Sequence, residues 1–264
     1  MTKMKFGMVV LALALLTAQP CQAEENEGIG LNVDVQVASA YVFRGLNVFQ
    51  ETKQMDQNML LAPSITYSIP GTSLEIGYWG AYQLNGANKS AMVDVGLGAE
   101  QDFWVGYSYS LTPDLSLSAL FTTYYYPLAD EKVAGTSNPI YIEPAIGLSW
   151  SGFVNVGFNI AYMYGVQDEV KAGRYLFLNP TLSKGWSLTE AIGLECTLDM
   201  GYKLFNEDID DNKWHAGLLV GVPISLPYNM YVTPGAGVVW TNLTGKDFAD
   251  ELAAFGSVNV GVSL

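Results

Sequence analysis

The sequence predicts an all-β fold, a transmembrane antiparallel β-barrel of about 12 strands of the outer-membrane type. Three observations carry this prediction. Apolar and polar residues alternate along many segments, short and long connections take turns between those segments, and half of the residues are hydrophobic while only 14% are charged. A soluble acidic domain usually carries more charge. A barrel with an apolar outside and a polar inside accounts for all three observations.

The first 23 residues predict a secretory signal peptide. Lys3 and Lys5 form a basic start, and Met8 to Leu16 is an apolar run too short to cross a bilayer as a helix. The run Cys21-Gln22-Ala23 offers a cleavage site followed by acidic residues. A lipid-anchored cysteine is the alternative, which Pro20 disfavours because such sites need a small residue there.

Removal of residues 1–23 makes the chain more acidic. Lys3 and Lys5 leave with this segment, so 10 Lys and Arg remain against 26 Asp and Glu, a net charge of −16. A chain this acidic repels nucleic acid and is not a polybasic membrane-surface protein. Cys196 is then the only cysteine, so no intramolecular disulfide forms, and its apolar phase indicates a small hydrophobic residue. Residues 24–264 are expected to form a single domain.

Strict alternation of apolar and polar residues is the dominant signal. It is clearest in Leu31 to Val37, Val154 to Tyr162 and Ile192 to Tyr202. Period two indicates a strand with one apolar face, and the segments are near the 9–11 residues that a tilted membrane strand needs. We expect strands at 31–44, 57–68, 74–83, 101–111, 114–126, 139–150, 153–164, 175–184, 191–204, 214–224, 230–240 and 255–264.

Short connections alternate with long ones along the chain. The short turns are Pro70-Gly71-Thr72, Thr112-Pro113-Asp114, Ser151-Gly152, Lys184 to Glu190 and Pro227-Tyr228-Asn229. The long connections are 45–56, 84–100, 127–138, 165–174, 205–213 and 241–254. Outer-membrane barrels have short periplasmic turns and long external loops, and an even strand number places both termini in the periplasm. The segment 91–99 also alternates, and we expect it to belong to a loop or to extend the fourth strand.

Aromatic residues gather near the strand ends and predict two interfacial girdles. Those beside long connections are Tyr41, Phe43, Tyr124 to Tyr126, Tyr162, Tyr164, Tyr202, Trp214 and Trp240, and those beside short ones are Tyr67, Trp150, Tyr228 and Tyr231. Ordinary packing of a β-core is the alternative. Four prolines fit the barrel less well, because proline lacks the ladder N–H and a closed barrel has no free edge. Bulges would accommodate Pro63, Pro144, Pro180 and Pro234.

The end of the chain indicates how such a barrel would be assembled. Val258, Val260, Val262 and Leu264 share one face. Assembly signals of outer-membrane barrels resemble this pattern, although they usually end on an aromatic residue. We expect the last strand to bind the barrel-assembly machinery, and the barrel to contact outer-membrane lipid and lipopolysaccharide.

The segment from Val35 to Gly45, VQVASAYVFRG, resembles the opening signature of a family of Gram-negative outer-membrane proteins, the TorF family. The Tyr-rich strand pair within Asp102 to Pro127 is similar as well. The resemblance implies an outer-membrane barrel with porin function in the bacterial outer membrane. It brings no catalytic motif.

The polar phase of the strands predicts which residues face the lumen. They are Asp34, Gln36, Arg44, Glu75, Glu143, Asn155, Asn159, Glu195, Asp199 and Lys203. Charged side chains that faced lipid would cost several kcal/mol near the midplane, so they are placed inside. Acids outnumber bases, which suits a polar channel that weakly prefers cations; the alternative is that these groups pair in a closed lumen. Arg44 is either a rim cation for anionic solutes or the partner of a neighbouring acid.

No motif predicts catalysis, a cofactor or a metal site. His215 is the only histidine, and the barrel lipases have a serine two positions after theirs, where this chain has Gly217. A histidine at the barrel rim beside Trp214 is therefore expected. The acids at 207–211 form either a solvated loop or a Ca²⁺ site without EF-hand spacing. We expect passive diffusion of small polar solutes or ions; the alternatives are a non-conducting structural or adhesive barrel and, less favoured, a barrel hydrolase.

Overall fold

The computed structural model describes residues 29–48, 59–84, 100–127, 138–167, 174–205, 213–242 and 251–264. The expected signal peptide, the segment 91–99 and the acidic loop at 207–211 lie outside these residues. Within the described part of the chain, the regular secondary structure is β-structure, and no helix there is long and apolar enough to cross a membrane.

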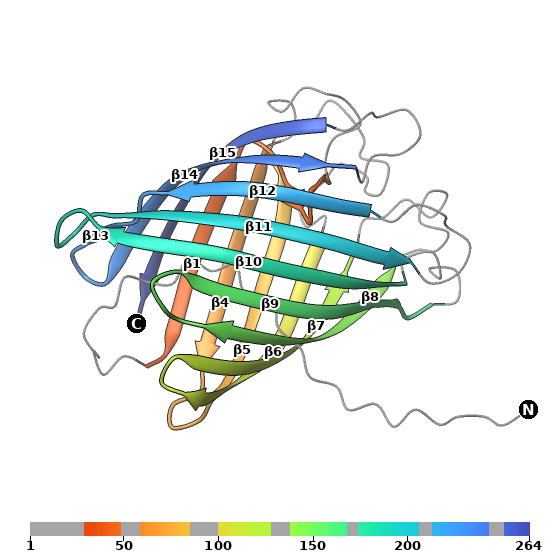
Figure 1. Cartoon of the computed structure of the whole chain (residues 1–264), viewed down its shortest axis with the longest axis horizontal. Helices are drawn as coiled ribbons and strands as arrows, with labels where there is room; N and C mark the ends of the chain where they lie inside the picture. Colours follow the sequence, from red (N-terminus) through yellow and green to blue (C-terminus); the bar gives the residue numbers. More distant parts are fainter. Residues whose placement is uncertain are drawn as a thin grey trace, which may run out of the picture.

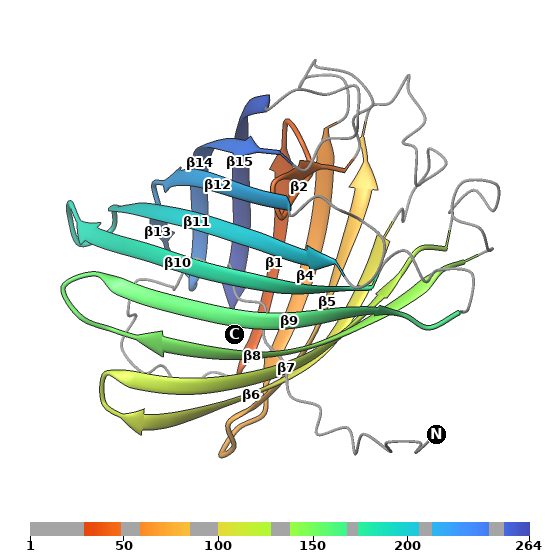
Figure 2. The same cartoon turned by 45° about the vertical axis from the view of Figure 1, so that its right-hand side comes forward.

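Twelve strands form one closed antiparallel barrel (Figures 1 and 2), which confirms the predicted fold class. They are β1 (Leu31–Ala38), β4 (Leu60–Ser68), β5 (Leu74–Gln83), β6 (Glu100–Thr112), β7 (Leu115–Tyr125), β8 (Ile140–Trp150), β9 (Asn155–Gly165), β10 (Tyr175–Ser187), β11 (Gly193–Phe205), β12 (Lys213–Gly221), β14 (Met230–Thr241) and β15 (Glu251–Ser263). Each pairs with its sequence neighbours, and β1 pairs with β15 to close the ring. The short β13 (Ile224–Leu226) follows β12 and also pairs with β14.

The two ends of the barrel differ in their connections. Short turns follow β4, β6, β8, β10 and β13, and we call their side the short-turn end. Leu31 and Leu264 meet at this end, where their backbones exchange hydrogen bonds of 3.1 and 2.8 Å. The longer connections all leave from the opposite side, the long-connection end. The alternation of short and long connections predicted from the sequence is therefore present.

The two phases of each strand face opposite environments. Large apolar residues on one phase, such as Val105, Ile146 and Val258, are exposed on the outside of the barrel. Residues of the other phase face the lumen, and on β6 and β8 they are polar, small or aromatic. Because side chains alternate between the two faces of a strand, the period-two pattern assigns each residue to lipid or lumen.

The first predicted strand, 31–44, is too long. β1 ends at Ala38, and a separate small hairpin follows, made of β2 (Val42–Phe43) and β3 (Leu46–Asn47). The reason is the turn between them: Arg44 has φ 50° and Gly45 has φ 81°. Two successive positive φ values form the tight turn of a two-residue hairpin, which reverses the chain.

The four strand prolines sit in the barrel without the expected bulges. All four lie on the outward phase of their strands. At Pro63, Pro144 and Pro180 the ladder is unbroken on one side and skips two residue pairs on the other, with the same register resuming beyond the gap. Each of these prolines, which have no N–H, therefore interrupts the hydrogen-bond ladder at one place and leaves the strand register unchanged.

At one of these gaps, a side-chain hydrogen bond replaces the missing backbone hydrogen bond. Pro180 would pair with Met200, and Asn179 Nδ2 donates to the Met200 carbonyl at 2.6 Å and to Asp199 Oδ1 at 2.8 Å. The side-chain amide therefore satisfies the carbonyl that a strand N–H would otherwise satisfy. For Pro234, Val222 N donates to the proline carbonyl at 2.9 Å.

The predicted aromatic girdles are correct in part. Trp214 and Trp240 pack edge to face on the outside near the long-connection end, with ring centroids 4.8 Å apart, and Trp150 is exposed near the short-turn end. The prediction is wrong for Tyr41, Phe43, Tyr124, Tyr126 and Tyr231, and the Phe43 ring packs on Tyr124 inside the barrel. Tyr41, Tyr124 and Tyr126 are buried inside the barrel, and Tyr231 lies on the inward phase of β14, where its hydroxyl accepts a hydrogen bond from Asn32.

Candidate functional site: a hairpin inside the lumen

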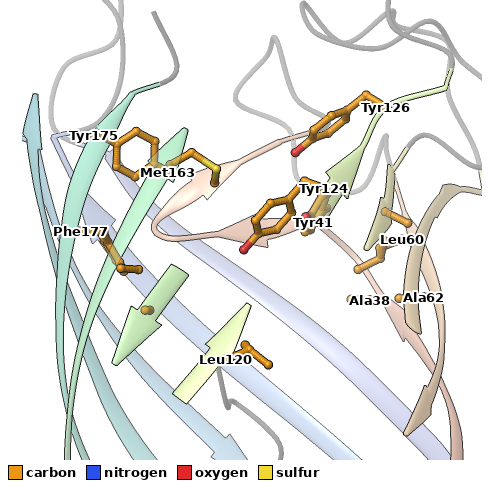
Figure 3. Packing of buried hydrophobic residues seen from close by; sticks show 13 residues of the cluster. Ala38, Tyr41, Leu60, Ala62, Leu120, Tyr124, Tyr126, Met163, Tyr175 and Phe177 are labelled. Carbon is orange, nitrogen blue, oxygen red and sulfur yellow. The ribbon is translucent and has the colours of Figure 1, made fainter. Parts of the chain in front are cut away.

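The segment Tyr41–Val48, which we call the lumen hairpin, crosses the inside of the barrel. Its backbone closes through a hydrogen bond of 2.7 Å from Val48 N to Tyr41 O. Figure 3 shows Tyr41 on this hairpin, between a wall that carries Tyr175 and Phe177 and a wall that carries Leu60 and Ala62. The hairpin leaves the barrel wall after β1 and reaches strands β8 and β10, each five strands away around the ring.

Arg44, at the tip of the hairpin, binds the opposite wall. Its Nη2 lies 2.6 Å from Glu143 Oε1 on β8, and both side chains are buried. Its Nη1 donates to the Tyr175 hydroxyl on β10 at 2.9 Å. The guanidinium also lies over the ring of Phe177, 4.2 Å from the centroid. A planar guanidinium suits this combination of carboxylate, hydroxyl and aromatic face. Of the two roles left open for Arg44, the structure shows the ion pair.

A second set of contacts holds the base of the hairpin. Tyr41 donates to Glu100 Oε2 at 2.8 Å, and Tyr126 donates to Oε1 of the same carboxylate at 2.8 Å. Glu100 is almost completely buried. Burial raises the pKa of the Tyr41 and Tyr126 hydroxyls, and the nearby Glu100 carboxylate adds to the rise, so both remain neutral donors. Tyr41 also packs on Trp79, with ring centroids 5.4 Å apart.

His215 faces the lumen, so the expectation of a rim histidine beside Trp214 is wrong. The two residues are neighbours on β12 and therefore point to opposite faces. His215 Nε2 lies 2.7 Å from Asp199 Oδ2, and its ring stacks on Phe177 with centroids 6.0 Å apart. A Cβ on Gly45 would lie 2.3 Å from His215 Cβ. The hairpin thus reaches the wall here with no space for a side chain.

The lumen differs in character on the two sides of the hairpin. Towards the long-connection end, a buried cluster of mainly aromatic and small residues surrounds it, including Tyr124, Met163 and Tyr175 (Figure 3). Towards the short-turn end the inward phases of β6 and β8 are small and polar, and Ser108 and Ser149 are exposed. The lumen is therefore open to water on the short-turn side and narrowed at the hairpin.

The ten residues predicted to face the lumen fall into two groups. Four gather at the hairpin, namely Arg44, Glu143, Asp199 and Lys203. Six lie on inward phases elsewhere along the wall, namely Asp34, Gln36, Glu75, Asn155, Asn159 and Glu195. That these ten residues border a conducting pore stays a prediction.

Sequence reasoning missed several residues of the site. Glu100, Asp102, Tyr124, Tyr175 and Phe177 were not among the predicted lumen residues, although all are buried there. The alternation of inward and outward residues along each strand could have identified them. Tyr124, for example, shares its face of β7 with Ser118 and Thr122, which marks it as inward.

Two carboxylate oxygens at this level, Asp102 Oδ1 on β6 and Glu143 Oε2 on β8, are buried without a hydrogen bond from a described residue. Lys203 on β11 is also buried, and its Nζ lies over the Tyr175 ring at 4.6 Å from the centroid. No group of three or more His, Cys, Asp or Glu residues in the described ranges is arranged to hold a metal ion.

Comparison with solved structures finds outer-membrane barrels with a similar fold. The KdgM porin superposes with a TM-score of 0.53 at 8% identity, over 88% of this chain and 99% of that one. The NanC porin gives 0.53 at 12% identity, over 89% and 98%. The COG4313 outer membrane channel from Pseudomonas putida F1 gives 0.53 at 10% identity, over 92% and 100%. These similarities show the fold.

No protein-family model and no curated protein matches the sequence. The resemblance to the TorF family therefore stays an expectation from the segment Val35 to Gly45.

Proposed function

We propose that this protein is a channel of the bacterial outer membrane for passive diffusion of small polar solutes, with the lumen hairpin as its narrowest section. The observation that carries the proposal is the hairpin itself, tied across the lumen by Arg44 and Glu143 at 2.6 Å. A barrel whose lumen needed only to be filled could use wall side chains. A polar, water-open half that ends at a tied constriction suits selective passage.

The similar solved structures support this proposal at the level of the fold. Two are described as porins and the third as an outer membrane channel. All three are spanned almost completely by the superposition, so the likeness concerns the whole barrel.

The weak cation preference is a finer part of the proposal and rests on the distribution of charge. Asp34, Glu75 and Glu195 lie on the inward phase, and none forms an ion pair with a residue that the structure describes. Fixed negative charge in a narrow tube attracts cations more strongly than the same charge in bulk water. The measurement is the reversal potential in a salt gradient, and a Glu75→Gln and Glu195→Gln double variant should bring it closer to zero.

A non-conducting barrel is the second candidate, because the cluster around the hairpin is well buried: Tyr41 is 5% exposed and Tyr124 is 3% exposed. Liposome swelling separates the two functions. Liposomes that contain the folded protein should admit neutral sugars at rates that fall with sugar size. Rates equal to those of protein-free liposomes, from barrels whose gel migration still changes on boiling, would favour the closed barrel.

A further inference from the structure

We propose that Lys203 forms a binding site for the carboxylate group of a small polar solute at the constriction. The inference names a substrate class for the proposed channel and rests on that function. Lys203 lies on the inward phase of β11, paired with Phe177 on β10, and its side chain is about nine-tenths buried. A buried ammonium is costly unless an anion or hydrogen-bond acceptors compensate it.

No described residue accepts a hydrogen bond from Lys203 or forms an ion pair with it. Among the described residues, its ammonium group has a cation–π contact with the face of the Tyr175 ring. Two inward-facing acids of the neighbouring wall are bound by other residues. Glu143 is bound by Arg44 at 2.6 Å, and Asp199 is bound by His215 at 2.7 Å and by Asn179 at 2.8 Å.

Lys203 is therefore the cation at this level that remains able to bind an anion. Arg44 and Lys203 both approach the Tyr175 ring, at 5.7 and 4.6 Å from its centroid, and of these two cations only Arg44 is paired with a carboxylate, that of Glu143. The buried acids Glu100 and Asp102 lie at this level as well, so the attraction for an anion comes from direct contact with Lys203 and not from a net positive charge. A carboxylate that reaches Lys203 would form a charge-assisted hydrogen bond in a site of low dielectric constant, where such bonds are strong.

This site is compatible with a weak overall preference for cations. The uncompensated acids Asp34, Glu75 and Glu195 act on every ion in the lumen through the long-range field, which salt screens. Lys203 acts at contact distance on a solute that has entered the constriction. The predicted behaviour is saturable binding of organic carboxylates in a channel whose small-ion current is carried mainly by cations.

The test compares gluconate with sorbitol, which has the same six-carbon polyol chain without the carboxylate. Both are titrated calorimetrically into the full-length folded barrel in detergent at constant ionic strength. Gluconate should bind and sorbitol should not. Lys203→Met should weaken gluconate binding by about tenfold or more, as expected for loss of a hydrogen bond to a charged group. Because the variant removes a buried charge without a partner, it should fold at least as well as the wild type.

Lys184→Gln is the matched control. Lys184 lies on the outward phase of β10, with its Nζ 4.3 Å from the Phe153 ring centroid, so its removal should leave gluconate binding unchanged. Equal binding of gluconate and sorbitol, or unchanged gluconate binding by Lys203→Met, would overturn the inference. If Lys203→Met failed to fold, the wild-type comparison of the two solutes would still decide. The titration needs no transport, so a barrel that binds gluconate but conducts nothing would refute the channel and keep the site.

Discussion

Arg44 and Glu143 are 99 positions apart in the sequence, and their side chains meet at 2.6 Å inside the barrel. This ion pair joins the tip of a hairpin that leaves the wall after β1 to strand β8 on the far side. Through this ion pair, the segment that follows β1 crosses the lumen instead of extending β1 along the wall.

The first prediction concerns this pair. Glu143→Gln leaves the buried Arg44 cation without its counterion, and loss of one partner of a buried pair costs about 3–5 kcal/mol. We expect a marked fall in the free energy of unfolding, measured by urea denaturation in vesicles. The double variant Arg44→Met with Glu143→Leu should recover most of that loss, because neither charge is left alone.

Glu195→Gln is the control for this prediction. Glu195 is also inward-facing, but no residue of the described chain forms an ion pair with it. Its replacement should change stability little. Equal losses for Glu143→Gln and Glu195→Gln would show that the ion pair does not hold the hairpin.

The second prediction concerns the contact between the hairpin and the wall. Gly45 has φ 81°, and an added Cβ would lie 2.3 Å from His215 Cβ. Gly71 has a similar φ of 73°, but nothing lies within 4 Å of an added Cβ. Gly71→Ala should cost only the backbone strain of about 1–2 kcal/mol. Gly45→Ala should cost clearly more, because it also pushes the hairpin away from β12. Equal thermal stabilities of the two variants would contradict the close packing.

The barrel could be predicted from the sequence, whereas the hairpin could not. Twelve segments alternate with a period of two, and strands in a membrane must all be paired, which requires a closed barrel. The number of strands could therefore be predicted. The hairpin was missed because Val42 and Phe43 continue the strand-like pattern of β1, and Arg44-Gly45 is not one of the common hairpin turns such as Asn-Gly.

The partners inside the lumen were hidden for a related reason. Alternation identifies the face on which Glu143 and Lys203 lie, but it does not say which distant residue each one meets. Tyr41 and Tyr126 were assigned to a girdle because they stand near strand ends. Their contact with Glu100 depends on the path of the hairpin, which the pattern does not contain.

The third prediction concerns the gap at Pro180. Asn179→Ala removes the hydrogen bond to the Met200 carbonyl and should destabilise the barrel by about 1–3 kcal/mol. In a Pro180→Ala background the same change should cost less, because the substituted residue supplies a backbone N–H opposite that carbonyl. A double-mutant cycle on unfolding free energies measures the difference. Asn155→Ala is the control, since the Asn155 side chain faces inward and makes no hydrogen bond to a described residue. Additive effects of the changes at 179 and 180 would refute the replacement bond.

The most direct test of the central claim is the single-channel conductance, in planar bilayers, of the wild type and of a variant that lacks residues 42–47. Both proteins should first show the heat-dependent gel migration of a folded barrel. If the lumen hairpin is the constriction of a channel, the wild type conducts and the variant conducts more, because the narrowest section has been removed. Equal conductance would show that the hairpin does not limit passage, and no conductance from either folded protein would contradict the channel itself.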